Sequence, residues 1–343
     1  MTATRTRAAQ HRMGLLRLDQ NTNVLGPNPV LARLELGGVD LSLYPEPHSE
    51  TLCEALTAHH ALRPGSVVVT RGSDEALDLL ARAVAGPRGH VSFPTPGFER
   101  YGSLASQHHL VATPVPLRGL RDLDVDGLCE AGRDLIIVAN PNNPTGHRVA
   151  GGELERLLSS TKAVVAVDEA YIEYAGARHS LLPRLESHPN LVVLRTFSKA
   201  YALAGLRIGW LAAAPALAKR LREAKAPFNV DTIAQSAARL ALGEQAWVDG
   251  CVDTVRHERV RLAEALGRRD CQVRPSEANF LLVRVPADPG LLAAAMRERG
   301  VAVKPYAEGP VAGHLRITVG GPAHTDATLT AFDAALESLE RSA

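Results

Sequence analysis

Lys199 lies in a segment whose residue types suit covalent chemistry, Ser198–Gly209 (SKAYALAGLRIG). It is one of only five lysines in a chain with 33 arginines, so a lysine here indicates a task that arginine cannot perform. A lysine amine can lose its proton and act as a nucleophile, whereas a guanidinium effectively cannot. The expected chemistry is a Schiff base between this amine and an aldehyde cofactor. The alternative is a solvated lysine in a surface loop.

Polar residues follow two apolar runs that we expect to be buried strands. Asp168 comes directly after Ala163–Val167, where a carboxylate is costly to bury without a partner. A protonated ring nitrogen would be such a partner, and the alternative is a helix N-cap. The segment Asn140–Gly146 follows the run Leu135–Ala139. Its two prolines and its glycine predict a rigid turn that directs asparagine amides beyond the strand, unless it is an ordinary loop between strand and helix.

Three more segments carry groups suited to ligands at strand ends. Gly72 allows a sharp turn before Ser73 and Asp74, and free backbone N–H groups at this helix start suit a phosphate. The alternative is a capped helix without a ligand. Phe98 offers an aromatic face, unless it packs in the core. Arg316 lies in an apolar strand and suits a bidentate grip on a carboxylate, the alternative being an ion pair on an edge strand.

The elements that must position these residues alternate in type along the chain. Apolar, β-branched runs predict strands at residues 67–70, 91–93, 110–116, 135–139, 163–167, 191–194 and 207–213. Amphipathic runs predict helices at residues 73–85, 98–108 and 152–160, the first capped by Ser73 or Asp74. This alternation predicts an α/β fold with a mostly parallel, doubly wound sheet. Ligands of such sheets bind beyond the carboxyl ends of the strands, where the residues above are found.

The character of the chain changes near residue 240. A long arginine-rich helix is predicted at 247–266, and the strands and helices that follow alternate over shorter spans. We therefore expect a small α+β domain over residues 241–343 and a large cofactor-binding domain over residues 41–240. Residues 18–40 are expected to pack near the small domain, and residues 1–17 to form a flexible tail.

Composition argues against several classes of partner. The net charge is +1 and the charged residues form no basic tract, which argues against nucleic acid and anionic membranes. No apolar run approaches the roughly 20 residues that cross a bilayer. The N-terminal residues lack the apolar core of a secretory signal. The four cysteines show no metal-ligand spacing, so we expect no metal, and idle thiols in a reducing cytoplasm.

Taken together, these residues resemble fold-type I, pyridoxal-phosphate-dependent class I/II aminotransferases, and within them the histidinol-phosphate aminotransferases. The resemblance runs from about Leu18 to the C-terminal helix. It rests on four motifs: Asn142–Gly146 (NNPTG), Val167–Glu173 (VDEAYIE), Arg195–Arg207 (RTFSKA to AGLR) and Leu315–Gly320 (LRITVG). It implies pyridoxal 5'-phosphate as the cofactor, a large and a small domain, and a homodimer.

The resemblance implies that five residues bind the ring of the cofactor or react with it. Lys199 would hold the cofactor as a Schiff base, the internal aldimine, and then move a proton between substrate and cofactor. Asp168 would pair with the pyridinium nitrogen and keep it protonated. Asn143 and Tyr171 would hydrogen-bond the phenolic oxygen, and Phe98 would stack on the ring. The phosphate would be held by Gly72, Ser73, Asp74, Ser198 and Arg207.

Four further residues are implied to act on the substrate or across the dimer. Tyr44 would reach the phosphate of the neighbouring subunit, which makes the enzyme a two-fold dimer with shared sites. Arg316 would clamp the carboxylate of glutamate or 2-oxoglutarate. Asn23 would contact the amino substrate, and Lys304 would hold the substrate's own phosphate.

The chain also departs from the family pattern near the substrate. Thr22 and Val24 replace a glutamate and a proline around Asn23, and Lys304 stands where many relatives have arginine. The favoured function is a histidinol-phosphate:2-oxoglutarate aminotransferase of histidine biosynthesis that works by a ping-pong route. One alternative is an aminotransferase for an aromatic or specialised-metabolite amino acid. Another is a lyase similar to threonine-phosphate decarboxylase, because Pro96–Tyr101 resembles the corresponding segment of those enzymes.

Overall fold

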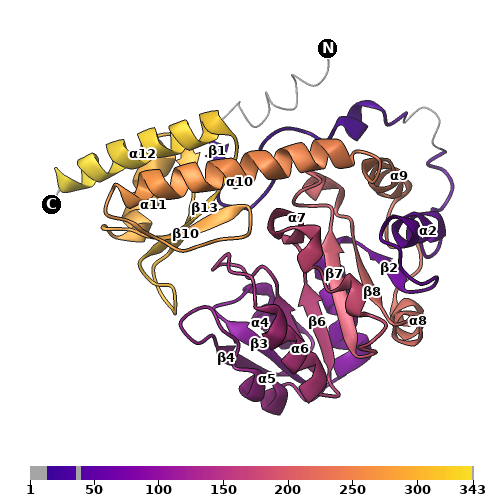
Figure 1. The fold of residues 1–343 in the computed structure, drawn as a ribbon. Helices are drawn as coiled ribbons and strands as arrows, with labels where there is room; N and C mark the ends of the chain where they lie inside the picture. Colours follow the sequence, from indigo (N-terminus) through magenta and orange to yellow (C-terminus); the bar gives the residue numbers. More distant parts are fainter. Residues whose placement is uncertain (1–13, 36–39, 342–343) are drawn as a thin grey trace.

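The computed structural model describes residues 14–35 and 40–341, which form a larger and a smaller unit (Figure 1). A seven-stranded sheet is the centre of the larger unit. In spatial order its strands are β2 (Val67–Thr70), β8 (Gly209–Ala213), β7 (Leu191–Thr196), β6 (Val164–Asp168), β5 (Leu135–Ala139), β3 (His90–Thr95) and β4 (Val111–Pro116). Strand β8 is antiparallel to both of its neighbours and the remaining pairs are parallel. The predicted α/β fold with a mostly parallel sheet is thereby confirmed.

Helices cover both faces of this sheet because its central strands are apolar on both sides. In β6, for example, Val165 and Val167 pack into one hydrophobic core and Ala166 into the other. Such continuous apolar runs are typical of parallel strands covered on both faces. The helices of this unit are α2 (Glu50–His59), α3 (Gly72–Leu80), α4 (Arg100–Gln107), α5 (Val125–Ala131), α6 (Gly151–Ser160), α7 (Ile172–Ala175), α8 (Pro215–Ala224) and α9 (Thr232–Ala241).

The smaller unit is an antiparallel sheet packed beneath long helices. Its strand order is β12 (Lys304–Tyr306), β13 (His314–Thr318), β10 (Phe280–Arg284) and β9 (Gln272–Val273). Its helices are α10 (Gln245–Gly267), α11 (Pro289–Glu298) and α12 (Pro322–Glu340). In Figure 1, α10 extends from the smaller unit across to the larger one. The domain boundary that we predict near residue 240 lies close to the junction of α9 and α10.

The N-terminal segment joins the smaller unit. Strand β1 (Leu16–Arg17) pairs in parallel with β11 (Val301–Ala302), so the expected tail is wrong at these two residues. Residues 1–13 of that tail lie outside the described residues. Leu18 is fully buried, donates its N–H to the Ala302 carbonyl and accepts from the Thr318 N–H.

The start of α3 differs from the prediction. The helix begins at Gly72, and Arg71 occupies the N-cap position without a side-chain cap, so neither Ser73 nor Asp74 is the cap. Gly72 adopts φ +74°, a conformation that favours glycine and turns the chain one residue earlier than expected. Ser73 and Asp74 consequently lie in the first helical turn. Strand β8 also begins late, at Gly209, because Arg207 follows a 3-10 turn with φ +50°.

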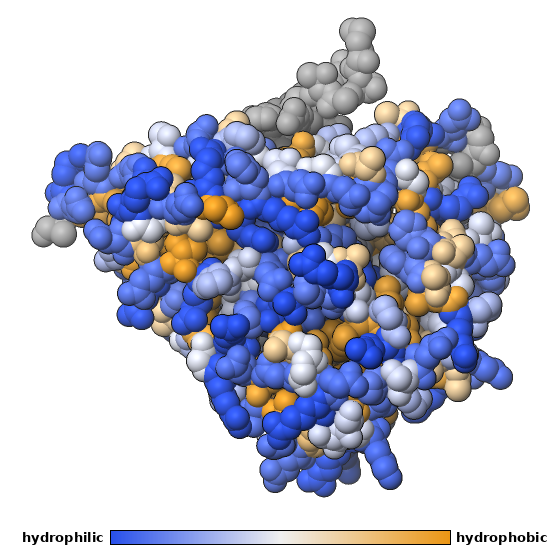
Figure 2. All heavy atoms as spheres, viewed as in Figure 1, coloured by the Kyte–Doolittle hydropathy of each residue, from blue (hydrophilic) through white to orange (hydrophobic). Residues whose placement is uncertain are grey.

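Polar side chains predominate on the face shown in Figure 2, with apolar residues scattered among them. Among the described residues, no helix combines the length and the apolar character needed to span a bilayer. The same part of the chain contains no group of three or more acidic, histidine or cysteine side chains placed to hold a metal ion.

Candidate active site

Lys199 lies in the loop after β7, within reach of the N-terminal segment. Its Nζ donates a hydrogen bond to the Gln20 carbonyl at 3.2 Å and lies 5.6 Å from the centre of the Tyr171 ring. Burial lowers the pKa of Lys199 to about 8, and the nearby Arg316 charge acts in the same direction. A substantial share of this amine is therefore neutral close to physiological pH, as a nucleophilic lysine requires.

Asp168 ends strand β6 as a buried carboxylate with neutral partners. It is 5% exposed and accepts hydrogen bonds from the Tyr101 hydroxyl and the Ala170 N–H, both at 3.1 Å. Burial raises its pKa to about 6, although both hydrogen bonds oppose this shift. No ion pair to Asp168 is formed within the described residues. A protonated ring nitrogen would be a cationic partner of the kind that such a carboxylate needs.

Arg316, on β13, connects the smaller unit to the turn after β5. Its Nη1 donates to Asn143 Oδ1 at 2.7 Å and its Nη2 donates to the Asp19 carbonyl at 2.7 Å. Its Nε is buried without a partner in the described structure. Because Asn143 Oδ1 accepts this bond from Arg316, the NH2 group of Asn143 is the part of the amide that can donate to a ligand oxygen. The Tyr171 hydroxyl accepts a hydrogen bond from Asn21 Nδ2 at 3.1 Å.

The first turn of α3 and Arg207 together form a cradle for an anion. Arg207 Nη2 donates to Asp74 Oδ2 at 3.1 Å, and a Cβ placed on Gly72 would lie 3.0 Å from the same nitrogen. A Cβ on Gly209 would lie 2.9 Å from the Ser73 nitrogen, so β8 also approaches this turn closely. Backbone N–H groups at a helix start beside a guanidinium suit a phosphate. Ser198, expected at the same phosphate, is buried next to Lys199.

A cavity of about 280 Å³ opens beside Arg316 and Asn143. Phe98 stands in its wall with its ring edge-to-face against Tyr101, at a centroid distance of 5.6 Å. Lys304 lies at the same cavity, 3.5 Å from Glu99. The complete lining consists of Asp19, Gly97, Phe98, Glu99, Asn143, Lys304, Tyr306 and Arg316. The fold thus brings an aromatic ring, an amide and two cations to one cavity.

Residues 14–336 match the family described as "Aminotransferase class I and II". The chain belongs to this family. Histidinol-phosphate aminotransferase 2 of Thiobacillus denitrificans is 37% identical over 93% of this chain and 91% of its own length. An aromatic amino acid aminotransferase of Rhodococcus jostii is 35% identical over 92% of this chain and 89% of its own length. The crystal structure of histidinol-phosphate aminotransferase from Sinorhizobium meliloti, in complex with pyridoxal-5'-phosphate, superposes with a TM-score of 0.86 at 27% identity, covering 97% of this chain and 95% of that chain.

Phe98, Asn143, Lys304 and Arg316 are the predicted site residues of this aminotransferase that line the cavity, whereas Asn23 and Tyr44 are held by contacts elsewhere. Asn23 donates through Nδ2 to the Ala200 carbonyl at 3.0 Å and accepts from the Leu25 N–H at 3.0 Å. Its side chain supports the Lys199 loop and is absent from the cavity lining. Tyr44 is 83% exposed and stacks on Phe228 at a centroid distance of 5.0 Å, so it reaches no site within its own chain.

Other residues of the aminotransferase site were not predicted. Asp19 and Tyr306 line the cavity, and Tyr101 contacts Asp168. Tyr101 carried a partial signal, because Phe98 lies three positions before it and the chain is poor in aromatic residues. Asp19 and Tyr306 carried no such signal in the sequence, since both reach the cavity only through the packing of the smaller unit.

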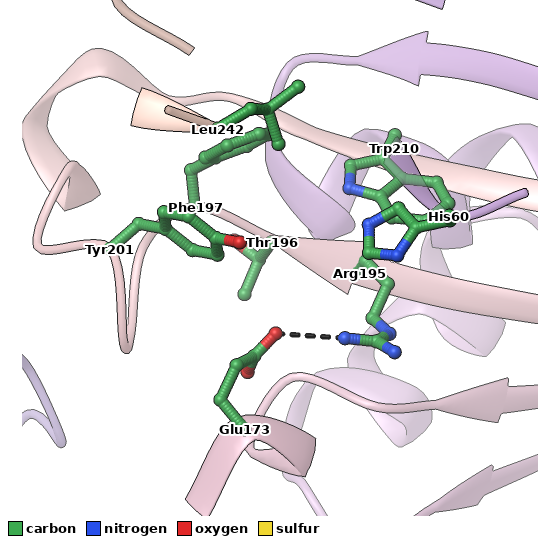
Figure 3. Close-up of a pocket in the computed structure, with 8 residues that line it drawn as sticks. All are labelled: His60, Glu173, Arg195, Thr196, Phe197, Tyr201, Trp210 and Leu242. Atoms are coloured by element: carbon green, nitrogen blue, oxygen red, sulfur yellow. Dashed lines mark hydrogen bonds and ion pairs between the residues drawn. The ribbon is translucent and has the colours of Figure 1, made fainter. Parts of the chain in front are cut away.

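Arg195 is the centre of a buried ion cluster in the aminotransferase, and Figure 3 shows its pair with Glu173. Arg195, on β7, donates through Nε to Glu169 at 2.9 Å and through Nη1 to Glu173 at 2.8 Å. Burial raises the pKa of both carboxyl groups, while the Arg195 charge opposes this shift. Glu169 directly follows Asp168, and Arg195 precedes Lys199 by four positions. The cluster therefore ties together the two strand ends that carry the candidate reactive residues.

Proposed function

We propose that this pyridoxal-phosphate-dependent aminotransferase exchanges an amino group between L-histidinol phosphate and 2-oxoglutarate. The observation that carries the proposal is the pair of cations in one cavity, Arg316 and Lys304, because the partners of this reaction carry a carboxylate and a phosphate. The curated histidinol-phosphate aminotransferases, at up to 37% identity over nearly the whole chain, support the same substrate.

Three features of the site fit pyridoxal phosphate. The cradle of Gly72 and Arg207 has the donors and the close backbone approach that a phosphate needs. Asp168 is a buried carboxylate that lacks a cation among its hydrogen-bond partners and fits a protonated ring nitrogen. Lys199 provides an amine of lowered pKa for the aldehyde. When bound, the cofactor supplies an electron sink for the substrate carbon that loses its proton.

The roles we assign to the chain's own groups follow from these positions. Lys199, with a pKa near 8, can both take a proton from the substrate carbon and return it. Asn143 and Tyr171 orient the ring through its phenolic oxygen, and Phe98 covers one ring face. Arg316 keeps a buried Nε without a partner, which leaves a donor for a carboxylate, while its bonds to Asn143 and Asp19 fix the guanidinium plane.

Lys304 is our candidate for the substrate phosphate. It supplies a positive charge at the cavity without the forked donors of arginine. Its present partner, Glu99, is an exposed carboxylate, so exchanging that ion pair for a phosphate costs little. A second candidate function, transamination of an aromatic amino acid, is favoured by the Rhodococcus jostii relative and by Phe98 and Tyr306 in the cavity wall.

The assembly and location we propose rest on the surface and on the thiols. Leu41, Leu43, Tyr44 and Phe228 are large exposed apolar side chains, which suits a homodimer in which Tyr44 reaches the site of the second copy. All four cysteines are free thiols, which suits the reducing cytoplasm.

A single-turnover spectrum tests the substrate. The purified holoenzyme is mixed with L-histidinol phosphate in the absence of a keto acid, and we expect its visible absorbance to be replaced by the near-ultraviolet band of pyridoxamine phosphate. Conversion with L-glutamate and L-phenylalanine, but not with L-histidinol phosphate, would overturn the histidinol-phosphate assignment and establish the aromatic one. Release of carbon dioxide from threonine phosphate would instead identify a lyase.

A further inference from the structure

Tyr101 makes a contact that the proposed function does not use. It lies on α4, is 1% exposed, and donates its hydroxyl to Asp168 Oδ2 at 3.1 Å. Burial and the Asp168 charge raise the pKa of the Tyr101 hydroxyl well above its usual value. The hydroxyl therefore stays protonated and acts only as a donor to the carboxylate.

The position of α4 links this hydroxyl to the face of the cavity. Phe98 precedes the helix and its ring lies edge-to-face against Tyr101, with an interplanar angle of 88°. Phe93, on β3, contacts Tyr101 from a second side at a centroid distance of 6.0 Å. A ring enclosed by two others has little freedom to turn, so the hydroxyl is held at one oxygen of Asp168.

The Asp168 carboxylate has two oxygens with different partners. Oδ1 accepts from the Ala170 N–H, and Oδ2 accepts from Tyr101. A donor to a carboxylate stabilises its ionised form, and here it opposes the effect of burial. When a carboxylate faces a protonated ring nitrogen, a hydrogen bond donated to the carboxylate helps to keep the shared proton on the nitrogen. Loss of the donor makes the carboxylate more basic and draws the proton toward it.

We propose that Tyr101 is a positioning residue that holds Asp168 ionised and oriented, so that Asp168 keeps the proton on the ring nitrogen of the bound cofactor. This inference rests on the proposed placement of that nitrogen against Asp168. Tyr101 itself touches neither substrate nor the reacting atoms. It acts through Asp168, and through Phe98 it couples the orientation of this carboxylate to the wall of the cavity.

The test is the variant Tyr101→Phe, which removes one oxygen and keeps the ring. Apoenzyme is loaded with pyridoxal phosphate labelled with ¹⁵N in the ring, and the ¹⁵N resonance reports whether the nitrogen carries a proton. We expect the resonance to move toward that of a neutral pyridine. We expect kcat to fall about tenfold or more, from the loss of one hydrogen bond to a charged group, with KM little changed. Tyr174→Phe is the matched control, because Tyr174 is equally buried, at 1% exposure, and lies on α7 outside the cavity lining.

The outcomes separate this inference from the function on which it rests. If the wild-type nitrogen is protonated and Tyr101→Phe leaves both its resonance and kcat unchanged, Tyr101 has no positioning role and the proposed function stands. If the wild-type nitrogen is already neutral, the placement of Asp168 fails and the inference falls with it. If Tyr174→Phe shifts the resonance as far as Tyr101→Phe does, the effect belongs to any lost buried hydroxyl, and the inference is likewise overturned.

Discussion

The variant Gly72→Ala tests the anion cradle that the first turn of α3 forms with Arg207. The variant Gly65→Ala is its matched control. Gly72 has φ +74°, and a Cβ on it would lie 3.0 Å from Arg207 Nη2. Gly65 has φ +82°, and a Cβ there would meet nothing within 4 Å. Both alanine variants carry the same backbone strain, and only the first crowds the arginine.

The expected magnitudes follow from this difference. A left-handed conformation costs a residue with a Cβ roughly 1–2 kcal/mol, so both variants should lose about that much unfolding free energy. In Gly72→Ala, the Arg207 guanidinium must also shift by a few tenths of an ångström, which disturbs its proposed contact with the phosphate. One hydrogen bond between charged groups contributes roughly 1.5–3 kcal/mol. Its loss should weaken pyridoxal phosphate binding by about 10- to 150-fold.

Two measurements on each variant separate the effects. Denaturant unfolding of the apoenzyme measures the unfolding free energy that the shared backbone strain removes. Titration of the apoenzyme with pyridoxal phosphate measures the dissociation constant of the cofactor. We expect equal losses of stability and a weakened cofactor complex in Gly72→Ala alone. Unchanged affinity in Gly72→Ala, or the same weakening in Gly65→Ala, would refute the assignment of the cradle to the phosphate.

Three further results are expected. Arg195→Met should lower the unfolding free energy by about 3–5 kcal/mol, because Glu169 and Glu173 are left buried without their cation; a loss below about 1 kcal/mol in denaturant unfolding would contradict this. The rate at which apoenzyme captures pyridoxal phosphate should rise with pH and level off above about 8, since the neutral Lys199 amine is the nucleophile; a stopped-flow profile still rising steeply at pH 10 would show an unshifted lysine. Lys304→Ala should raise KM for L-histidinol phosphate about tenfold while KM for L-glutamate stays within twofold, as expected for loss of one ionic contact to phosphate; equal increases for both substrates in steady-state assays would place Lys304 elsewhere.

The parts of the site that could be predicted from sequence are those that follow strands. Asp168 comes directly after an apolar run and Lys199 follows another by five positions, and ligands bind beyond the carboxyl ends of such strands. Gly72 was predicted by the same logic, although the cap itself was wrong. Ser73 and Asp74 are residue types that commonly cap helices. The helix nevertheless begins before them, at Gly72, because this glycine adopts a positive φ.

The parts that could not be predicted depend on contacts between distant segments. Arg316 and Asn143 are 173 positions apart, and only the packing of β13 against the turn after β5 brings them together. Asn23 belongs to a segment predicted to contact substrate, yet both ends of its amide bind backbone groups. Tyr306 enters the cavity from an edge strand too short for a periodic signal. The periodicity of helices and strands contains no information on contacts between such distant segments.

The hydrogen bonds of the N-terminal segment set an order of events during synthesis. Asn21 donates its N–H to the Thr318 hydroxyl, 297 positions later, and donates through Nδ2 to the Tyr171 hydroxyl, 150 positions later. Domains of a nascent chain fold as they emerge, at roughly 5–20 residues per second. Residues near Asn21 leave the ribosome before their partner on β13, which emerges about 15–60 s later at that rate. The segment near Asn21 thus reaches its final place only after β13 has been made, and the nascent chain has no complete pocket before that point.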